Sequence, residues 1–398
     1  MGSKTHYSII LHLSLIGFFA IFSTTIAKNP VLPLYVSVLG GGDAVIGLIS
    51  SVSPFAGILL SFPVGALSDK VGRKKLLRLS GIVFLAAPLL YLLVSDPLLL
   101  IPVRFFHGMA TAILGPVMSA LIAERFTETK GERIGQYSSA TLYGRTLAPL
   151  VGGALISYFV FAPDLFRYQS VYLSAFGAGL IVFLLILKLD EPEPHSRQRC
   201  KLSDFWMSLT TFMSNIHLRG AAYVDMAVYF IFGAFETFLP LYLLANQIEP
   251  FLIGVIFAVQ VLSIALTKPF FGRMADRTDP RYQIIGGVLI LGVSVGVIPL
   301  FQTFFPVLII SLLSGLGMSL STVATTKYVA DIAEKEDIGA SMGALSSIMD
   351  IGHSGGPLLT GVIITYAGYQ TGFGFCLVLA FVFALYFFIG SRVRKTTR

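Results

Sequence analysis

Three carboxylates and one imidazole lie in strongly apolar segments of the sequence. We expect such segments to be shielded from water. Asp225 and Glu236 fall in one apolar run, and Asp350 and His353 are three residues apart in another. Ionisable groups inside a membrane are costly, and they mark ion or substrate pathways. Because such groups bind and release protons, we interpret all four as proton-coupling candidates. The alternative is a structural hydrogen bond across helices, with His353 as the partner of Asp350.

The substrate-binding candidates are aromatic or cationic residues in the same kind of segment. Asp225 and Glu236 are eleven residues apart, about three helical turns, so both project from one face. Aromatic side chains near them could form an adaptable apolar pocket for lipophilic compounds, although lipid contact and helix packing are alternatives. A cation could bind an anionic substrate or neutralise a carboxylate. The candidates are Phe18, Phe22, Lys28, Asn29, His107, Arg145, Tyr229 and Phe235.

The composition predicts that these residues lie on membrane-spanning helices. Of 398 residues, 55% are hydrophobic and 12% are charged, whereas a soluble domain carries about a quarter charged residues. Crossing roughly 30 Å of hydrocarbon takes about 20 helical residues. We expect an all-α membrane protein with twelve helices, because the alternating ten-residue segments of a membrane β-barrel do not dominate. The expected helices span about 7–35, 44–67, 76–95, 97–124, 134–160, 168–188, 220–244, 250–272, 282–302, 304–331, 338–366 and 370–390.

The basic residues predict the topology. With the N-terminus inside, 22 of the 28 Lys and Arg residues fall in inner loops or at the termini, and Arg167 alone falls in an outer loop. This bias places both termini in the cytoplasm of a multi-pass protein of the inner, or cytoplasmic, membrane. The net charge of +7 therefore reflects topology, and we expect no nucleic acid partner.

An internal duplication relates the two halves of the chain. The run Leu32–Tyr35 recurs as Leu239–Tyr242, and Gly108 recurs as Gly315, both after 207 residues. Six helices per repeat give both halves the same orientation, as in two bundles related by an axis along the membrane normal. We expect a six-helix bundle over 1–189, a cytoplasmic linker over 190–218 and a second six-helix bundle over 219–398. The two bundles are pseudo-symmetric.

A glycine-rich, charged run follows the second expected helix. Gly65, Asp69, Gly72 and Arg73 belong to the stretch Gly-Ala-Leu-Ser-Asp-Lys-Val-Gly-Arg-Lys-Lys. Glycines allow helix ends to approach closely, and an acid beside basic groups can form a charge latch between helices. The second copy keeps Asp276 but lacks the basic tail, so its latch should be weaker. A charge cluster that serves topology alone is the alternative.

Glycines and prolines recur in the fifth and eleventh expected helices. Small residues on one stripe permit tight helix packing, and proline removes a hydrogen bond and bends a helix. We interpret these positions as helix hinge and packing sites. They are Gly144, Pro149, Gly152 and Gly153, with Gly352, Gly356 and Pro357 after a shift of 208.

These motifs resemble those of the major facilitator superfamily, in particular its twelve-helix drug/proton antiporter branch. The Gly65–Lys75 run is similar to the loop signature of the family, and Arg104 followed by Gly108 is similar to its fourth-helix motif. The resemblance implies that Arg104 takes part in proton transfer, although it could also snorkel to the outer surface. It also implies that the first and fourth helices of each half line the cavity, and that the glycine-proline pattern accompanies antiport.

The leading hypothesis is therefore a proton-coupled antiporter that exports amphipathic small molecules, such as drugs, by alternating access. The alternative is a transporter, or importer, of a specific metabolite or organic anion, with Arg104 and Arg145 as ligands. A membrane enzyme or sensor is a third class, but no nucleophile–base pair or metal-ligand cluster stands out. We expect no catalytic residues, no metal and no cofactor. The expected partners are a small-molecule substrate, protons (sodium ions are the alternative) and the lipid bilayer, and we expect a monomer.

Overall fold

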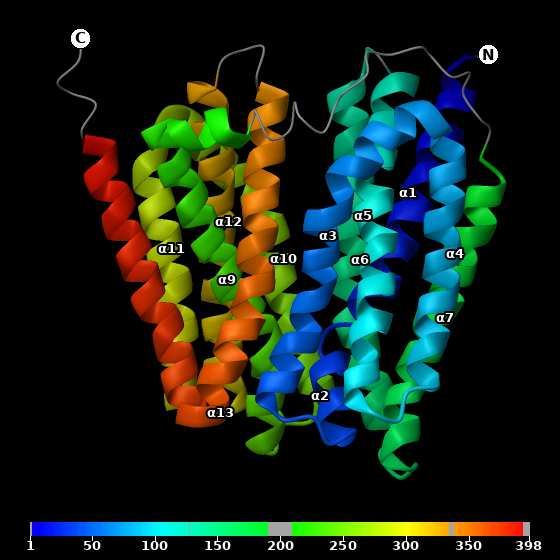
Figure 1. The fold of residues 1–398 in the computed structure, drawn as a ribbon, viewed down its shortest axis with the longest axis vertical. Helices are drawn as coiled ribbons and strands as arrows, with labels where there is room; N and C mark the ends of the chain where they lie inside the picture. Colours follow the sequence, from blue (N-terminus) through cyan, green and yellow to red (C-terminus); the bar gives the residue numbers. More distant parts are fainter. Residues whose placement is uncertain (1, 127, 190–208, 334–337, 393–398) are drawn as a thin grey trace. The chain divides into compact units, whose positions relative to one another are not determined.

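The computed structural model describes residues 2–126, 128–189, 209–333 and 338–392. Within those ranges the long elements are all helices (Figure 1). They are α1 (Gly2–Ile26), α2 (Val31–Val38), α3 (Asp43–Val71), α4 (Arg73–Leu92), α5 (Leu100–Arg125), α6 (Lys130–Tyr158), α7 (Asp164–Leu187), α9 (Ile216–Ala245), α10 (Pro250–Arg277), α11 (Pro280–Val297), α12 (Phe304–Ile332) and α13 (Ile338–Arg392). Short 3-10 turns, Pro97–Leu99 and Ile298–Leu300, precede α5 and follow α11. The all-α prediction is confirmed.

Ten of the described helices are long and apolar enough to cross a membrane. The ten include α13 as one span, but Gly368 has a φ of 77° and divides α13 into two helices. Few side chains other than glycine adopt this conformation easily. With α6, which is 29 residues long, this division brings the number of spanning helices to twelve.

The first expected helix is wrong in one respect. It was predicted to run unbroken over 7–35, but α1 ends at Ile26 and α2 begins at Val31. Pro30 precedes α2 and carries no backbone N–H, so it cannot continue the hydrogen-bond ladder of α1.

The described chain forms two compact units. Unit 1 comprises 1–41, 55–200 and 249–258, and unit 2 comprises 42–54, 201–248 and 259–398. The first turns of α3 thus belong to unit 2, and those of α10 belong to unit 1. The expected boundaries at 189 and 219 did not include this exchange of segments between the units. Part of the expected linker, 190–208, lies outside the described residues.

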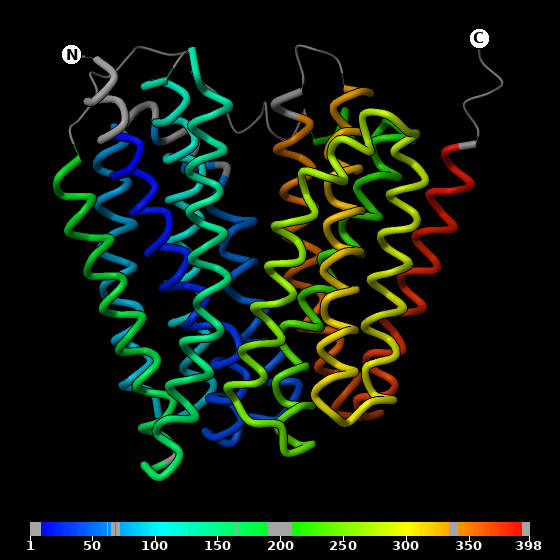
Figure 2. The backbone as a smooth tube through the Cα atoms, turned by 180° about the vertical axis from the view of Figure 1, so that it is seen from behind, coloured from blue at the N-terminus to red at the C-terminus, as the bar shows by residue number. Residues whose placement is uncertain are grey.

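In unit 1, α1 packs against α6 and α7, and α4 packs against α5 and α7. The blue α1 and the teal α6 run side by side in Figure 2. Leu13, Ile16, Phe84 and Val117 are buried in the core of this unit. Apolar residues on the facing stripes of α1, α4, α5 and α7 therefore hold unit 1 together.

Unit 2 repeats this pattern with α9 in the place of α1. α9 packs against α13, α12 and α11, and α11 packs against α12 and α13. In the most apolar 18-residue stretch of α9, 89% of the residues are buried, whereas this share is 33% to 56% in the same kind of stretch of the other spanning helices. α9 is therefore the most enclosed helix, and polar side chains on it are shielded from lipid.

Equivalent contacts confirm the predicted duplication. The Tyr35 hydroxyl donates to the carbonyl of Tyr91 at 2.8 Å and to that of Val94 at 3.4 Å. The Tyr242 hydroxyl donates to the carbonyl of Phe301 at 3.0 Å. Tyr242 and Phe301 follow Tyr35 and Val94 by 207 residues, so the repeat preserves this tether as well as the sequence pattern.

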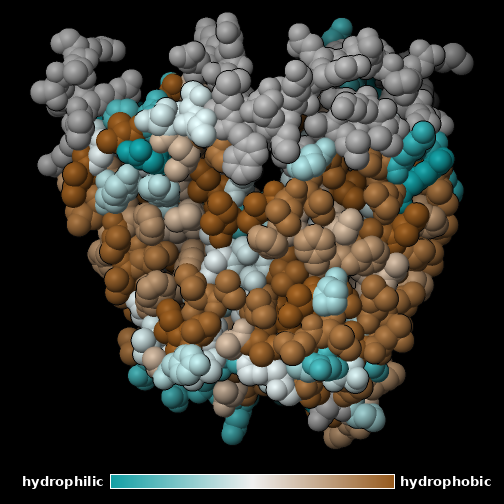
Figure 3. Space-filling model, viewed as in Figure 1, coloured by the Kyte–Doolittle hydropathy of each residue, from teal (hydrophilic) through white to brown (hydrophobic). Residues whose placement is uncertain are grey.

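Surface hydropathy fits a membrane environment. On the face drawn in Figure 3, apolar residues cover the middle of the helices and hydrophilic residues gather near their ends. Exposed side chains on the helices include Leu266, Ile309 and Leu385. Water would not favour so many exposed apolar side chains, whereas lipid tails accommodate them.

Candidate functional site

A partly buried acid–imidazole pair joins α9 and the first part of α13 in unit 2. Glu236 is 8% exposed, and its Oε2 lies 3.1 Å from Nε2 of His353. Charged groups buried in a low-dielectric interior must be paired or neutralised. If a proton bound to this pair, its charge and its hydrogen bond would both change. The pair is therefore suited to linking a proton to the packing of two helices.

Aromatic rings and a glycine hold His353 in place. The rings of Tyr229 and Phe232 lie 6.2 and 5.9 Å from the imidazole. A Cβ added to Gly233 would come within 2.9 Å of the His353 carbonyl oxygen. Glycine at this position lets α9 approach α13 closely enough for the pair to form.

The alternative interpretation, a pairing of Asp350 with His353, is wrong, because the imidazole binds Glu236 instead. Asp350 is half-buried, and Asp225 is 4% exposed. Neither carboxylate has a hydrogen-bond or ion-pair partner among the described residues. The structure therefore brings together only two of the four proton-coupling candidates on α9 and α13.

The equivalent positions in unit 1 hold different chemistry. Asn29 corresponds to Glu236 after a shift of 207, and Arg145 corresponds to His353 after a shift of 208. Asn29 is buried, whereas Arg145 is exposed and has no partner within the described chain. Sequence reasoning missed that Arg145 and His353 are equivalent, although the shift of 208 contained the signal.

The other expected substrate-binding residues are dispersed. Phe18 and Phe22 are half-buried on α1, with rings stacked 6.2 Å apart. Lys28 is half-buried in the turn after α1. Phe235 is fully buried and offers no surface to a ligand in this structure.

Arg104 and His107 belong to a buried cluster in unit 1 that contains none of the coupling carboxylates. Nη1 of Arg104 lies 3.3 Å from the Tyr91 hydroxyl, and that hydroxyl lies 3.2 Å from Nδ1 of His107. The Tyr91 ring is stacked on Tyr172, with centroids 4.3 Å apart. Sequence reasoning missed Tyr91 and Tyr172, because neither stands out from the other aromatic residues of the apolar segments.

At the start of α4, the charged loop makes an ion pair that was not predicted. Gly72 has a φ of 95°, and Nη2 of Arg73 lies 2.5 Å from Oε1 of Glu124 at the end of α5. The surroundings of Gly65 and the side chain of Asp69 lie outside what the structure describes. In unit 2, Asp276 is exposed and has no partner among the described residues. Arg73–Glu124 is thus an ion pair between the start of α4 and the end of α5, and its role as a latch stays a prediction.

The glycines of α6 and α13 sit where backbones touch. A Cβ on Gly144 would overlap the carbonyl oxygen of Phe18, and one on Gly352 would overlap that of Met226. Gly356 faces the carbonyl of Phe230 in the same way. Gly152 faces Ile26 and Val31, and Gly153 faces the carbonyl of Pro250. Pro149 and Pro357 lie inside these helices.

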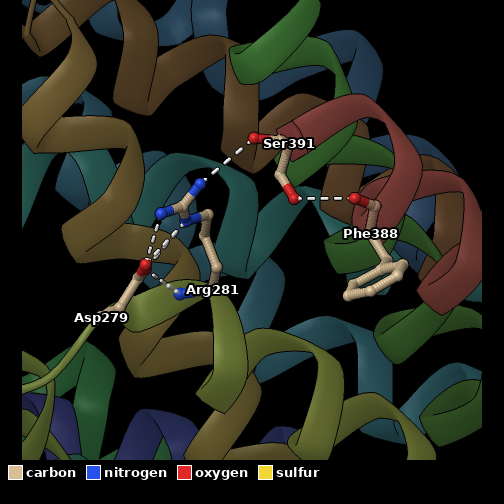
Figure 4. A network of polar contacts seen from close by, with 4 residues as sticks. All are labelled: Asp279, Arg281, Phe388 and Ser391. Carbon is tan, nitrogen blue, oxygen red and sulfur yellow. Dashed lines mark hydrogen bonds and ion pairs between the residues drawn. The ribbon is translucent and has the colours of Figure 1, made fainter. Parts of the chain in front are cut away.

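A cavity of about 230 Å³ in unit 2 does not coincide with the acid–imidazole pair. Its lining includes Gly220 and Ser391, and 16 residues separate Gly220 from Glu236 along α9, about 24 Å of helix. The Ser391 carbonyl accepts from Arg281, which also pairs with Asp279 (Figure 4). No group of three or more His, Cys, Asp or Glu in the described ranges could hold a metal ion.

Comparisons with known proteins place the chain in a family. The sequence profile of the Major Facilitator Superfamily matches residues 13–248 and 224–398. An uncharacterised MFS-type transporter of Methanocaldococcus jannaschii is 24% identical over 89% of this chain and 90% of its own length. The multidrug resistance protein MdtG of Dickeya zeae is 26% identical over 98% of this chain and 95% of its own length.

The fold is shared with solved transporters. The crystal structure of the nucleoside transporter NupG matches 96% of this chain and 99% of its own, with a TM-score of 0.80 and 14% identity. This level of identity shows the fold alone. Because the profile covers both repeats, the chain belongs to the Major Facilitator Superfamily.

Proposed function

We propose that this transporter is a proton-coupled antiporter that exports amphipathic small molecules, including drugs, by alternating access. The observation that carries the proposal is the hydrogen-bonded Glu236–His353 pair between α9 and α13, in which Glu236 is buried and His353 is half-buried. The likeness to the multidrug resistance protein MdtG supports the substrate class. The basic residues of the expected inner loops support a cytoplasmic position for both termini.

The pair would couple a proton to movement in three steps. Without a proton the carboxylate and imidazole attract one another through their hydrogen bond, which holds α9 against α13. When a proton binds to the pair, the charge of the pair changes, and so does the attraction between α9 and α13. When the proton is released on the other side of the membrane, the original attraction is restored. One proton moving down 100 mV supplies about 2.3 kcal/mol, roughly a forty-fold concentration ratio.

Two carboxylates without a partner in the described ranges, Asp225 and Asp350, flank this pair and serve the substrate in the proposal. Asp225 lies on α9 about three turns before Glu236, and Asp350 lies one turn before His353. Their lack of a partner among the described residues leaves each available to a cationic substrate or a second proton. The half-buried Tyr229 would supply the apolar contact.

The test is transport by the purified chain in proteoliposomes that enclose a pH indicator. A lipophilic cationic dye is the probe, and an imposed pH gradient is the driving force. We expect gradient-driven dye movement in the wild type and a loss of about tenfold or more in Glu236→Gln, since about 1.4 kcal/mol of coupling corresponds to tenfold. Glutamine keeps the shape of the side chain but cannot carry the charge.

The matched control is Glu132→Gln, which neutralises an exposed carboxylate on α6. This variant should transport like the wild type. Proton-coupled antiport would be ruled out by dye movement that is independent of the pH gradient. In that case, neutralising Asp225, Glu236 and Asp350 together would not reduce the movement.

A specific metabolite or organic anion transporter is the second candidate. The guanidinium of Arg145 favours it, because this group is exposed and has no partner in the part of the chain that the structure describes, and arginine binds carboxylates and phosphates. In the same proteoliposomes, competition by acidic metabolites together with loss of transport in Arg145→Gln would support this candidate. Competition by lipophilic cations alone would reject it.

A further inference from the structure

The Arg104 cluster in unit 1 has no role in the proposed coupling pair, yet it concentrates buried donors. Arg104 and His107 are each 2% exposed, and Tyr91 and Tyr172 are fully buried. Arg104 and His107 are three residues apart on α5, so they share a face of that helix. Tyr91 contacts both, and Tyr172 stacks on Tyr91.

The charge of Arg104 is not neutralised by any described carboxylate. Its hydrogen-bond partner is the neutral Tyr91 hydroxyl, and no ion pair involves it within the described chain. An arginine side chain stays protonated in proteins. A buried charge without a counter-charge is strongly unfavourable. Arg104 also lies in the second turn of α5, where the helix dipole is positive.

The hydrogen bonds around Tyr91 determine which donor atoms of the cluster remain without a partner in the described protein. The Tyr91 oxygen accepts from Arg104, so its own hydrogen is available to Nδ1 of His107. His107 then carries its proton on Nε2, and that atom is a donor. Nε2 of His107, Nε of Arg104 and the hydroxyl of Tyr172 are all buried without a hydrogen-bond partner in the described protein. All three can donate.

Tyr35 also contacts the ring of Tyr172, but its hydroxyl forms no hydrogen bond with the Tyr172 hydroxyl. Its ring meets Tyr172 edge-on, with centroids 5.2 Å apart, and its hydroxyl is already used by the Tyr91 carbonyl. The surroundings are thus one cation, several donors and apolar ring faces. Buried donors need acceptors, and a positive charge needs a negative one.

We propose that Arg104, His107 and Tyr172 form a buried site for a small inorganic anion of the halide class, with chloride as its physiological ligand. The anion would accept from the three donors and neutralise the guanidinium. This site is independent of the proposed coupling pair, which lies in unit 2. It is also distinct from a substrate site, because the residues that form it are almost fully enclosed.

The test measures the unfolding temperature of the full chain in detergent by circular dichroism at 222 nm. Chloride or bromide replaces gluconate at constant ionic strength. A ligand that binds the folded state raises its stability by mass action. We expect the midpoint to rise by several degrees with halide concentration and then to saturate.

Two variants and one control separate the anion site from a general salt effect. Arg104→Gln should lose the halide shift, and Tyr172→Phe should need at least a few-fold more halide, because it removes one donor and keeps the ring. Arg277→Gln, which removes an exposed guanidinium in the last turn of α10, should respond like the wild type. If Arg104→Gln does not fold, Tyr172→Phe decides the outcome.

Anomalous diffraction from crystals grown in bromide provides a direct reading. A peak beside Arg104, His107 and Tyr172 would support the site. A halide shift that is the same in all variants, equal midpoints of the wild type in chloride and gluconate, or a water instead of bromide in the cluster would each overturn the proposal. None of these measurements depends on transport, so the proposed function is tested separately.

Discussion

Units 1 and 2 repeat the same helix contacts but place opposite charges on them. In unit 2 the contact of α9 with α13 carries Glu236 paired with His353. In unit 1 the equivalent positions, in the turn after α1 and on α6, hold Asn29 and Arg145. The fourth helices differ as well, since Arg104 corresponds to Ser311 and His107 to Ser314.

The difference shows which features of a duplicated fold must be kept. Ser314 accepts from Gln260 at 3.1 Å, so unit 2 fills the place of the Arg104 cluster with neutral polar groups. Close backbone contacts are fixed by shape, and few residues satisfy them. Polar side chains in the same places are not fixed by shape in this way, and they differ between the two units. Function can therefore diverge between the halves while the packing does not.

The largest expected effect tests the shared packing. Gly144→Ala and Gly352→Ala each place a Cβ against a backbone carbonyl, of Phe18 and Met226 respectively. Because a backbone cannot give way as a side chain can, each substitution should cost about 1–3 kcal/mol of stability. Thermal unfolding of the purified variants in detergent would measure both costs.

The same helices supply matched controls. Gly135 and Gly343 are equivalent positions on α6 and α13 with nothing within 4 Å of an added Cβ. Alanine at either should stabilise its helix, by up to about 1 kcal/mol. If Gly144→Ala and Gly352→Ala behave like these controls, the close contacts do not hold the units together.

A smaller effect tests the tyrosine tethers. Tyr35→Phe and Tyr242→Phe remove equivalent hydroxyls that donate to the carbonyls of Val94 and Phe301. Each loss should cost about 1 kcal/mol, a typical net contribution of one hydrogen bond. Tyr35→Phe should cost more, because its bond to the Tyr91 carbonyl is buried and 2.8 Å long, whereas the bonds of Tyr242 to Pro299 and Phe301 are part-buried and 3.2 and 3.0 Å long. Equal or reversed costs in thermal unfolding would show that the two tethers are not comparable.

The smallest effect concerns the charged ends of the units, where Arg73–Glu124 in unit 1 contrasts with Asp279–Arg281 in unit 2. The Asp279 side chain caps α11 and binds Arg281, which also donates to the Ser391 carbonyl. Hydrogen bonding from Arg281 lowers the pKa of Asp279, against the opposing effect of partial burial. Asp279→Asn keeps a capping side chain, so it should cost only about 0.2–1 kcal/mol.

The lowered pKa of Asp279 determines how the stability contributed by this ion pair changes with pH. A carboxylate with a lowered folded-state pKa stabilises the protein fully above its unfolded pKa of about 3.9. The stabilisation is lost as the pH falls through the folded value. The difference between wild type and Asp279→Asn should therefore be present at pH 7 and vanish in acid. A difference that grows toward low pH in urea unfolding would contradict the pairing.

The sequence by itself determined the number of helices, the duplication and the glycine positions at which helices meet. These properties follow from local hydropathy and from a constant shift along the chain, as Gly144 and Gly352 illustrate. The sequence also selected Glu236 and His353, because ionisable residues are rare in apolar segments. The break before Val31 escaped prediction, although Pro30 was its visible cause.

Only the tertiary structure decided which of these side chains meet. His353 binds Glu236, 117 residues away, rather than Asp350. Arg73 binds Glu124, and Arg104 meets Tyr91 rather than a carboxylate. Such pairings depend on how each helix is rotated about its axis and how closely two helices approach. Packing across the whole unit sets both quantities, so spacing along one helix cannot reveal them.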